Sequence, residues 1–369
     1  MRRILGVVLA VLLIGGVAAA VVAGRGTGDE EEGARAATTT VRGVIGSEKA
    51  AFFEDPDVVE ALADHGLTVR VETAGSWSMR ELPLKEYDFA FPSSSSAAEE
   101  LGRWTKVRGG LIRPFYSPLV VVAHQAAAEV LADNGLATLS GPDRTTGTLR
   151  MAEYLRAARR DTTWQQLEGT AGRQELTGTL FVSTTDPLSS NSGALYLAAA
   201  SFVANGGTVV AGPAGLDRTE GLLRKLTRVQ GAQQPSSEGP FRDFVSGVGN
   251  PLVLVYEQQV AGLLLAKYDP GDLTVLYPDT TVSSDHTVVP VTEEGRRLGE
   301  LLRTDDRLRT LAVRHGFRPQ GAAAEFTAAT APHTDHLNQK LTGIRQAPVP
   351  TAEVLRKMAT RARGEERRS

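Results

Sequence analysis

Short apolar runs recur along the chain, and most lead into segments whose apolar residues have helical spacing. In the first half these runs lie at residues 41–45, 67–72, 87–91 and 118–123. Pro56 at the first helical position and Gly66 after the last one delimit one of the helices between them. Strands that alternate with helices predict an α/β protein with mixed, mostly parallel sheets covered by helices on both faces.

The second half of the chain repeats this alternation. Strands are expected at residues 180–182, 251–256 and 273–277, and helices at 126–133, 149–159, 220–229, 257–265, 292–302 and 305–315. An extended, turn-rich passage follows at residues 278–291, and a basic helix or tail at 350–369. With 369 residues, the chain is long enough for two lobes that each have a core.

The most informative polar segment runs from Thr184 to Gly193, between the strand at 180–182 and a well-patterned helix. A helix that begins there leaves several backbone N–H groups without intrahelical partners, and the dipole favours negative charge at that end. Ser190, Asn191, Ser192 and Gly193 are therefore candidates to hold a carboxylate or an oxyanion. Simple N-capping is the competing interpretation, although one Ser or Asn would suffice for that purpose.

Two other strand ends carry small polar residues. Ser93, Ser94 and Ser95 follow the run at 87–91, and Gly46 with Ser47 follows the run at 41–45. Because ligands in open α/β sheets sit beyond the carboxyl ends of the strands, we expect these residues to face the same space. A flexible loop with a helix cap is the alternative for the serines.

Tyr256 and Glu257 stand at the end of another buried strand. The Tyr256 hydroxyl can donate one directed hydrogen bond to a carboxylate or oxyanion. Glu257 would repel an anion, so it is expected to face away, to pair with a cation such as Lys49, or to contact a positive group on the ligand. An amphoteric or organic ligand is therefore an alternative to a simple anion.

Composition narrows the classes of function. The chain has no cysteine, which excludes disulfides, thiol catalysis and thiolate metal sites. Its net charge of −3 lacks the basic excess that is typical of nucleic-acid-binding proteins. No local motif of a hydrolase, metalloprotease or P-loop enzyme is present, so no catalytic residues and no cofactor are expected. His333 and His336 have ligand-type spacing but no third ligand near in sequence, so no metal site is expected.

The N-terminus carries an export signal. Residues 4–24 are uncharged and mostly apolar, with Arg2 and Arg3 before them and acidic residues at 29–32 after them. A run of this length can span a bilayer, and the charge order directs the rest of the chain outside the cytoplasm. Residues 1–25 are thus expected to be a signal anchor, or alternatively a cleaved signal peptide, with 26–40 as a linker. The protein is then extracytoplasmic, anchored to the cell membrane or secreted.

Four segments in this order resemble the type II periplasmic-binding-protein fold of bacterial extracellular solute-binding proteins. They are the strand and small-residue turn at 87–93, the apolar strand at 115–122, the polar segment at 185–193, and the Leu276-Tyr277-Pro278 region with the closing helices up to Pro319. The resemblance is to binders of molybdate, tungstate, sulfate and phosphate in particular. It covers residues 41–342.

The resemblance implies two α/β lobes joined by crossing strands, with lobe one at residues 41–117 and 284–343 and lobe two at 118–283. Residues 344–369 would be a basic tail, solvated or in contact with anionic lipid. The implied function is capture of a small polar or anionic ligand by lobe closure, with an ABC-type permease as a further partner. A membrane-tethered sensor or interaction protein on the same scaffold is the alternative.

Overall fold

The structure is a computed structural model, and it describes residues 38–105 and 110–365. The expected signal segment at residues 1–25 and most of the linker lie outside these ranges. Within them, no helix is both long enough and apolar enough to cross a bilayer. The described residues from Thr39 onward form one compact unit.

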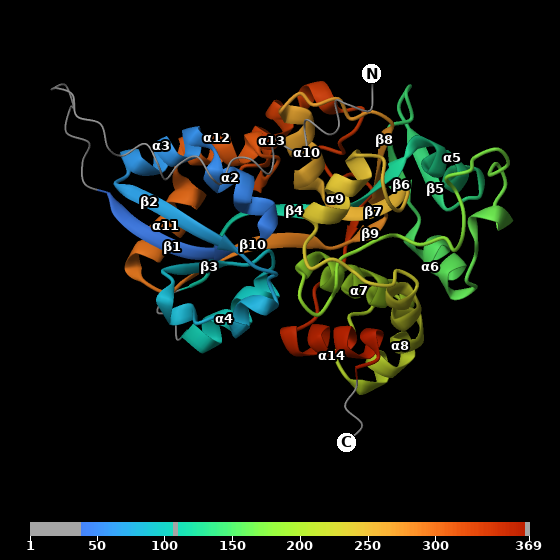
Figure 1. Cartoon of the computed structure of the whole chain (residues 1–369), viewed down its shortest axis with the longest axis horizontal. Coiled ribbons are helices and arrows are strands. Elements are labelled where there is room, and N and C mark those ends of the chain that lie inside the picture. Colours follow the sequence, from blue (N-terminus) through green and yellow to red (C-terminus); the bar gives the residue numbers. More distant parts are fainter. Residues whose placement is uncertain (1–37, 106–109, 366–369) are drawn as a thin grey trace. The chain divides into compact units, whose positions relative to one another are not determined.

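Lobe one is built from two segments that are far apart in the sequence (Figure 1). Its first part consists of β1 (Thr39–Ile45), α2 (Ala50–Glu54), α3 (Pro56–Asp64), β2 (Leu67–Thr73), β3 (Phe89–Phe91) and α4 (Ser95–Thr105). Its second part consists of β10 (Ser283–Pro290), α11 (Glu293–Thr304) and α12 (Asp306–Arg314). Asp55 caps α3 by accepting a hydrogen bond from the backbone of Asp57, and Pro56 occupies the first helical position as expected.

Lobe two is built from the middle of the chain. It contains the second half of β4 (Ile112–His124), α5 (Gln125–Asp133), β5 (Ala137–Ser140), β6 (Thr146–Leu149), α6 (Met151–Arg159), α7 (Asn191–Ala204), α8 (Pro213–Arg228), α9 (Glu238–Val245), β7 (Leu252–Tyr256), α10 (Glu257–Leu265), β8 (Leu273–Pro278) and β9 (Thr280–Thr281). After α12 the chain adds β11 (Arg318–Pro319), α13 (Ala323–Ala329), β12 (Arg345–Gln346) and α14 (Ala352–Arg363).

A single strand path, in the order β2-β1-β3-β10-β4-β8-β6-β5, runs through both lobes, and β7 and β11 also pair with β4. The strand β4 is 13 residues long, so its first half pairs with β10 and its second half with β7 and β8. The expectation of mostly parallel sheets is wrong. Parallel pairing is confined to β1–β2, β1–β3, β6–β8 and β9–β12 among the described strands, because β4 and β10 cross between the lobes in antiparallel directions.

The alternation of strand side chains divides each lobe into two apolar layers. In lobe one, Ile45 and Phe91 pack with α2, α3, α11 and α12, whereas Val44 and Ala90 pack on the α4 side. In lobe two, Val121 of β4 faces the layer of α6, α7 and α8, and Val122 faces that of α9 and α10. Strands covered on both faces have few positions for polar residues, which accounts for the nearly continuous apolar run at 118–123.

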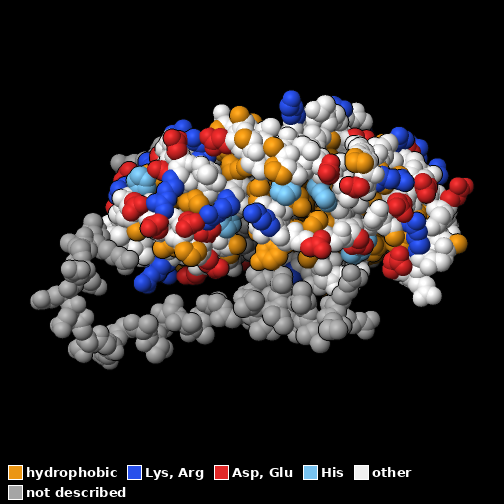
Figure 2. Space-filling view, turned by 90° about the horizontal axis from the view of Figure 1, so that it is seen from above, with side chains coloured by type: hydrophobic (Ala, Val, Ile, Leu, Met, Phe, Trp, Pro, Cys, Tyr) orange, Lys and Arg blue, Asp and Glu red, His pale blue; other side chains and the backbone are white. Residues whose placement is uncertain are grey.

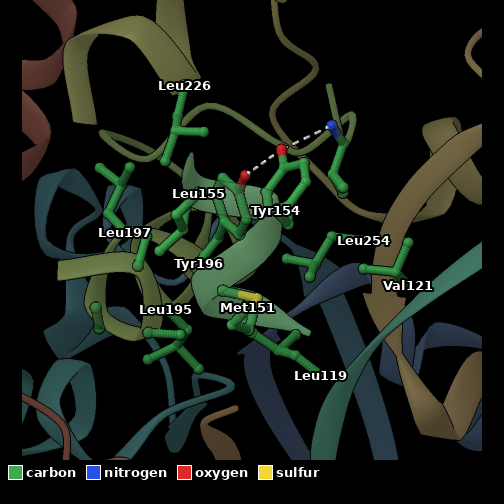
Figure 3. Close-up of a cluster of buried hydrophobic side chains, with 14 of the residues drawn as sticks. Leu119, Val121, Met151, Tyr154, Leu155, Leu195, Tyr196, Leu197, Leu226 and Leu254 are labelled. Atoms are coloured by element: carbon green, nitrogen blue, oxygen red, sulfur yellow. Dashed lines mark hydrogen bonds between the residues drawn. The ribbon is translucent and has the colours of Figure 1, made fainter. Parts of the chain in front are cut away.

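Two tyrosines meet inside the first lobe-two layer (Figure 3). The hydroxyls of Tyr154 and Tyr196 lie 2.8 Å apart, and the backbone N–H of Val182 donates to the Tyr154 hydroxyl at 3.0 Å. The expected strand at 180–182 does not form. Its backbone makes irregular contacts of this kind, and isolated bridges between Thr163 and Thr179 and between Ser183 and Val253 flank it on either side.

The closing segments differ from the expected domain boundaries. Phe326 of α13 and Leu337 pack with Val120 and Val253 of the lobe-two strands, so the chain leaves lobe one well before residue 343. The expected tail at 344–369 contains α14, which packs along α7 and α8 and reaches α4 of lobe one (Figure 1). Its apolar face is formed by Ala352, Leu355, Met358, Ala359 and Ala362, all buried at helical spacing.

The basic residues of α14 are paired with acidic ones. Arg356 forms an ion pair with Glu100 of α4, and Arg361 pairs with Asp217 of α8 at 2.5 Å. On the face shown in Figure 2, basic and acidic side chains are likewise interspersed.

If α14 is part of the core, truncating its buried side chain must cost stability. Met358→Ala removes a side chain that is 1% exposed and is expected to lower the free energy of unfolding by about 2–5 kcal/mol. The matched control is Lys357→Ala, whose side chain is 57% exposed and whose loss should change stability by less than about 0.5 kcal/mol. Chemical denaturation of both variants measures the difference, and equal effects would show that α14 is not packed as described.

Candidate functional site

The ends of three strands and the start of one helix meet at a small pocket between the lobes. Gly46 follows β1, Ser93 follows β3, Tyr256 ends β7, and Ser190 with Asn191 begins α7. The full lining is Gly46, Ser47, Glu48, Ala74, Gly75, Ser76, Ser93, Ser190, Asn191, Pro235, Ser236, Ser237 and Tyr256. Its free volume is about 10 Å³, roughly the space of one water molecule.

Asn191 joins the lobes at this pocket. Its side-chain Nδ2 donates to the backbone carbonyl of Ser93 at 2.9 Å and lies 3.2 Å from the Tyr256 hydroxyl. Because a carbonyl can only accept, the amide orientation is fixed, and Oδ1 becomes the remaining acceptor. That Oδ1 is buried and has no hydrogen-bond partner among the described residues. An orphaned buried acceptor in a pocket is a position where a ligand donor would fit.

The backbones of the two lobes also touch beside the pocket. The N–H of Trp77 donates to the carbonyl of Ser189 at 3.1 Å. A Cβ added to Gly75 would lie 2.3 Å from the same carbonyl oxygen, so this approach requires glycine.

Four of the predicted site residues do not line the pocket. The hydroxyl of Ser192 lies 2.7 Å from that of Thr185, and the N–H of Gly193 donates to the same Thr185 hydroxyl at 2.9 Å. Ser94 accepts a hydrogen bond from the N–H of Ala97 at 3.3 Å and so caps α4, where Ser95 is the first residue. These residues hold the two helix starts in place.

A charged cluster that the sequence did not predict lies directly behind the pocket. The Glu48 carboxylate accepts short hydrogen bonds from Lys49 Nζ and from the Ser93 hydroxyl. Lys49 Nζ also lies 3.2 Å from Nδ1 of His286 and 3.1 Å from the Ser93 hydroxyl. Lys49 and His286 are fully buried, and Glu48 is 7% exposed, so the carboxylate is the charged group nearest the pocket.

The charges of this cluster follow from burial and proximity. Burial alone would raise the pKa of Glu48, but the Lys49 ammonium and His286 outweigh it and hold that pKa well below its usual range. Burial lowers the pKa of Lys49, and Glu48 opposes this shift. Burial and the charge of Lys49 lower the pKa of His286 to about 4, so this imidazole is neutral at neutral pH.

Since an ammonium can only donate, Nδ1 of His286 accepts from Lys49 and the ring proton lies on Nε2. Nε2 is buried without a hydrogen-bond partner among the described residues, and the ring lies among Phe115, Tyr256 and Phe317. The cluster therefore presents one carboxylate to the pocket and keeps its positive charge behind it.

Glu257 faces away from the pocket, which was one of the expected possibilities. Its carboxylate is fully buried, pairs with Arg318 at 2.5 and 2.8 Å, and accepts from the Tyr277 hydroxyl at 2.5 Å. The expected partner Lys49 contacts Glu48 instead. Arg80 does not line the pocket either, and its guanidinium lies 3.6 Å from the Glu100 carboxylate.

The sequence contained a weak signal for the cluster. Glu48 and Lys49 follow Gly46-Ser47 at a strand end, where two charged residues would ordinarily be solvent-exposed. His286 lies 237 residues from Lys49, and nothing in the local pattern links it to the first strand.

Sequence comparison finds no matching protein-family model and no matching curated protein. Structural comparison finds similar folds. The sulfate-binding protein of Mycobacterium tuberculosis H37Rv matches with a TM-score of 0.53 at 17% identity, covering 85% of this chain and 93% of that one. The substrate-binding protein of an ABC transporter from Agrobacterium tumefaciens matches with 0.55 at 14% identity, covering 88% and 95%.

A third similar structure is an ABC transporter solute-binding protein from Thermotoga lettingae bound to α-D-tagatose. It matches with a TM-score of 0.55 at 13% identity, covering 88% of this chain and 94% of that one. The chain therefore has the two-lobed α/β fold of the type II periplasmic binding proteins, which confirms the fold that its motifs predicted. The named ligands of these proteins differ in charge, so the fold alone does not select a ligand.

The low pKa of His286 predicts a specific pH dependence of stability. In the unfolded chain this group protonates near pH 6.5, and in the folded protein only near pH 4. The unfolded state thus binds more protons between these values, and the folded state should lose roughly 3 kcal/mol as the pH falls through this window. His286→Gln should remove that component.

Unfolding free energies at pH 7 and pH 4.5 measure this loss. His333→Gln is the control, because this half-buried histidine lies in a short 3-10 helix (Ala331–His333) outside the cluster. An identical pH slope in wild type and His286→Gln would contradict the neutral, buried imidazole.

Proposed function

We propose that the protein is an extracytoplasmic solute-binding protein that captures a small polar ligand in the pocket between its lobes. The observation that carries this proposal is the orphaned Oδ1 of Asn191, in a pocket formed by both lobes at the strand ends. Residues Gly46, Ser47, Ser93, Ser190 and Tyr256 would complete the contact surface.

The groups around the pocket favour a ligand that donates hydrogen bonds. Asn191 offers an acceptor, Glu48 offers a carboxylate, and none of the described residues that line the pocket is Lys, Arg or His. A bare oxyanion would lie against Glu48, whereas an uncharged polyol or an amine would hydrogen-bond to it. We therefore propose a neutral or cationic ligand rather than the anion that the sequence first suggested.

Capture requires movement of the lobes. The free volume holds about one water molecule, and the contacts of Asn191 and Trp77 join the lobes around it. A ligand would enter when these contacts open and would stabilise the closed arrangement when they re-form around it. The crossing strands β4 and β10 are the connections at which such a hinge would act.

The remaining parts of the proposal concern location and partners. The apolar run near the N-terminus would tether the protein outside the cytoplasm, and an ABC-type permease would receive the ligand. The similar structures from Agrobacterium tumefaciens and Thermotoga lettingae, both ABC transporter proteins by name, support this proposal. A binding role rather than catalysis is consistent with the neutral, hydrogen-bonding character of most pocket residues.

Thermal melting with a ligand panel tests the proposal. Sugars, polyols and amines should include a compound that stabilises the protein by about 2.7 kcal/mol at a hundredfold excess over Kd, and sulfate, phosphate and molybdate should not. Stabilisation by an oxyanion alone would contradict the proposed ligand class. No stabilisation by any class would contradict solute capture.

For the compound so found, Asn191→Ala should weaken binding by about 10- to 100-fold, because a buried hydrogen-bonding group is lost. Ser94→Ala is the matched control, since Ser94 lies next to Ser93 but caps α4 outside the pocket. Isothermal titration calorimetry of both variants measures the difference. Equal affinities would show that the ligand binds elsewhere.

A further inference from the structure

A second pocket lies within lobe two, between the α8–α9 connection, α9 and the turn that precedes β7. Its free volume is about 170 Å³, far larger than that of the pocket between the lobes. Side chains of Thr184, Gln230, Gln233, Asp243 and Asn250 give it a polar lining. Neither the motifs nor the proposed function accounts for it.

Gln233, which lines this pocket, has an unused side-chain acceptor. Its Nε2 lies 3.0 Å from both the hydroxyl of Thr184 and the carbonyl of Thr185. The carbonyl of Thr185 can only accept, so the amide orientation is fixed, as for Asn191. Oε1 of Gln233 is buried and has no hydrogen-bond partner among the described residues. A buried acceptor left in this state favours a ligand that brings a donor.

The charged and polar side chains that line this pocket also favour a ligand that donates hydrogen bonds. Asp243 contributes a carboxylate, to which Gln234 Nε2 donates at 3.0 Å, and none of the lining residues is Lys, Arg or His. Val248 and Val253 add apolar surface, and Val248 is 61% exposed at the rim. A primary ammonium with a short apolar part matches this combination of acceptors and aliphatic contacts.

The segment from Gln230 to Ser237 separates the two pockets. Gln230, Gln233 and Gln234 line the lobe-two pocket, whereas Pro235, Ser236 and Ser237 line the pocket between the lobes. The carbonyl of Gln234 accepts from the N–H of Asp186 at 2.9 Å, which fixes the segment to the polar stretch that leads into α7. The two pockets are therefore adjacent but distinct.

We propose that the lobe-two pocket is a second ligand site, which binds a small organic ammonium ion through Gln233 Oε1 and the Asp243 carboxylate. This site lies wholly within lobe two, so it does not depend on closure of the lobes. It is independent of the proposed function, because neither Gln233 nor Asp243 lines the pocket between the lobes.

Ligand-observed NMR titration of the full chain with ethylammonium chloride tests this site. Sodium acetate of equal ionic strength is the control, because acetate has similar size but can only accept. Saturable binding of ethylammonium without saturable binding of acetate is expected. No saturable binding of ethylammonium, or equal binding of both ions, would overturn the proposal.

Two variants locate the probe. Gln233→Leu and Asp243→Asn should each weaken ethylammonium binding at least fivefold. Because Asp243 is only half-buried, Asp243→Asn is expected to fold and tests the site even if Gln233→Leu does not fold. Asn191→Ala reports on the pocket between the lobes. Loss of the probe in Asn191→Ala with retention in both other variants would place it there and overturn the second site.

Discussion

The carbonyl oxygen of Ser93 is one of the points at which the two lobes are hydrogen-bonded to each other. It accepts from Asn191 at the start of α7 and from the hydroxyl of Ser284 on the crossing strand β10. Asn191 also reaches the Tyr256 hydroxyl, so one amide group links the ends of β3 and β7 to the first turn of α7. Three elements far apart in sequence are thereby held at one place. The contact uses only Nδ2, which leaves the other half of the amide available to a ligand.

The groups around Ser93 determine what this junction can accommodate. Its hydroxyl donates to Glu48, whose carboxylate is in turn balanced by the buried Lys49. The positive charge is fully buried and the negative charge borders the pocket, so the pocket offers acceptors more than cationic donors. A Cβ on Gly46 would lie 2.6 Å from both Glu48 carboxylate oxygens, and glycine at this position therefore keeps the carboxylate close to the strand end.

The sequence predicted the features that depend on local pattern. Gly46, Ser93 and Tyr256 at strand ends and Asn191 at a helix start could be assigned to one space, because ligands in open α/β sheets lie beyond the carboxyl ends of the strands. Contacts between side chains far apart in sequence could not be predicted from the local pattern. They determine the surroundings of the charged groups, because Lys49 contacts His286 and Glu257 pairs with Arg318. The basic residues of α14 led to the prediction of a tail, although the helical spacing of Leu355, Met358 and Ala362 already indicated an apolar face. Antiparallel crossing by β4 and β10 has no local signal either, since a buried strand has the same apolar pattern in both directions.

The most direct test of this account is the distance between the lobes with and without the Asn191 contact. The sequence has no cysteine, so Val59→Cys on α3 and Tyr268→Cys after α10 allow two spin labels at exposed positions, one in each lobe. Pulsed electron paramagnetic resonance should give a narrow distance distribution in the otherwise wild-type protein, and Asn191→Ala should broaden it toward longer distances. Coinciding distributions for the two proteins would contradict the claim that the Ser93–Asn191 junction holds the lobes together.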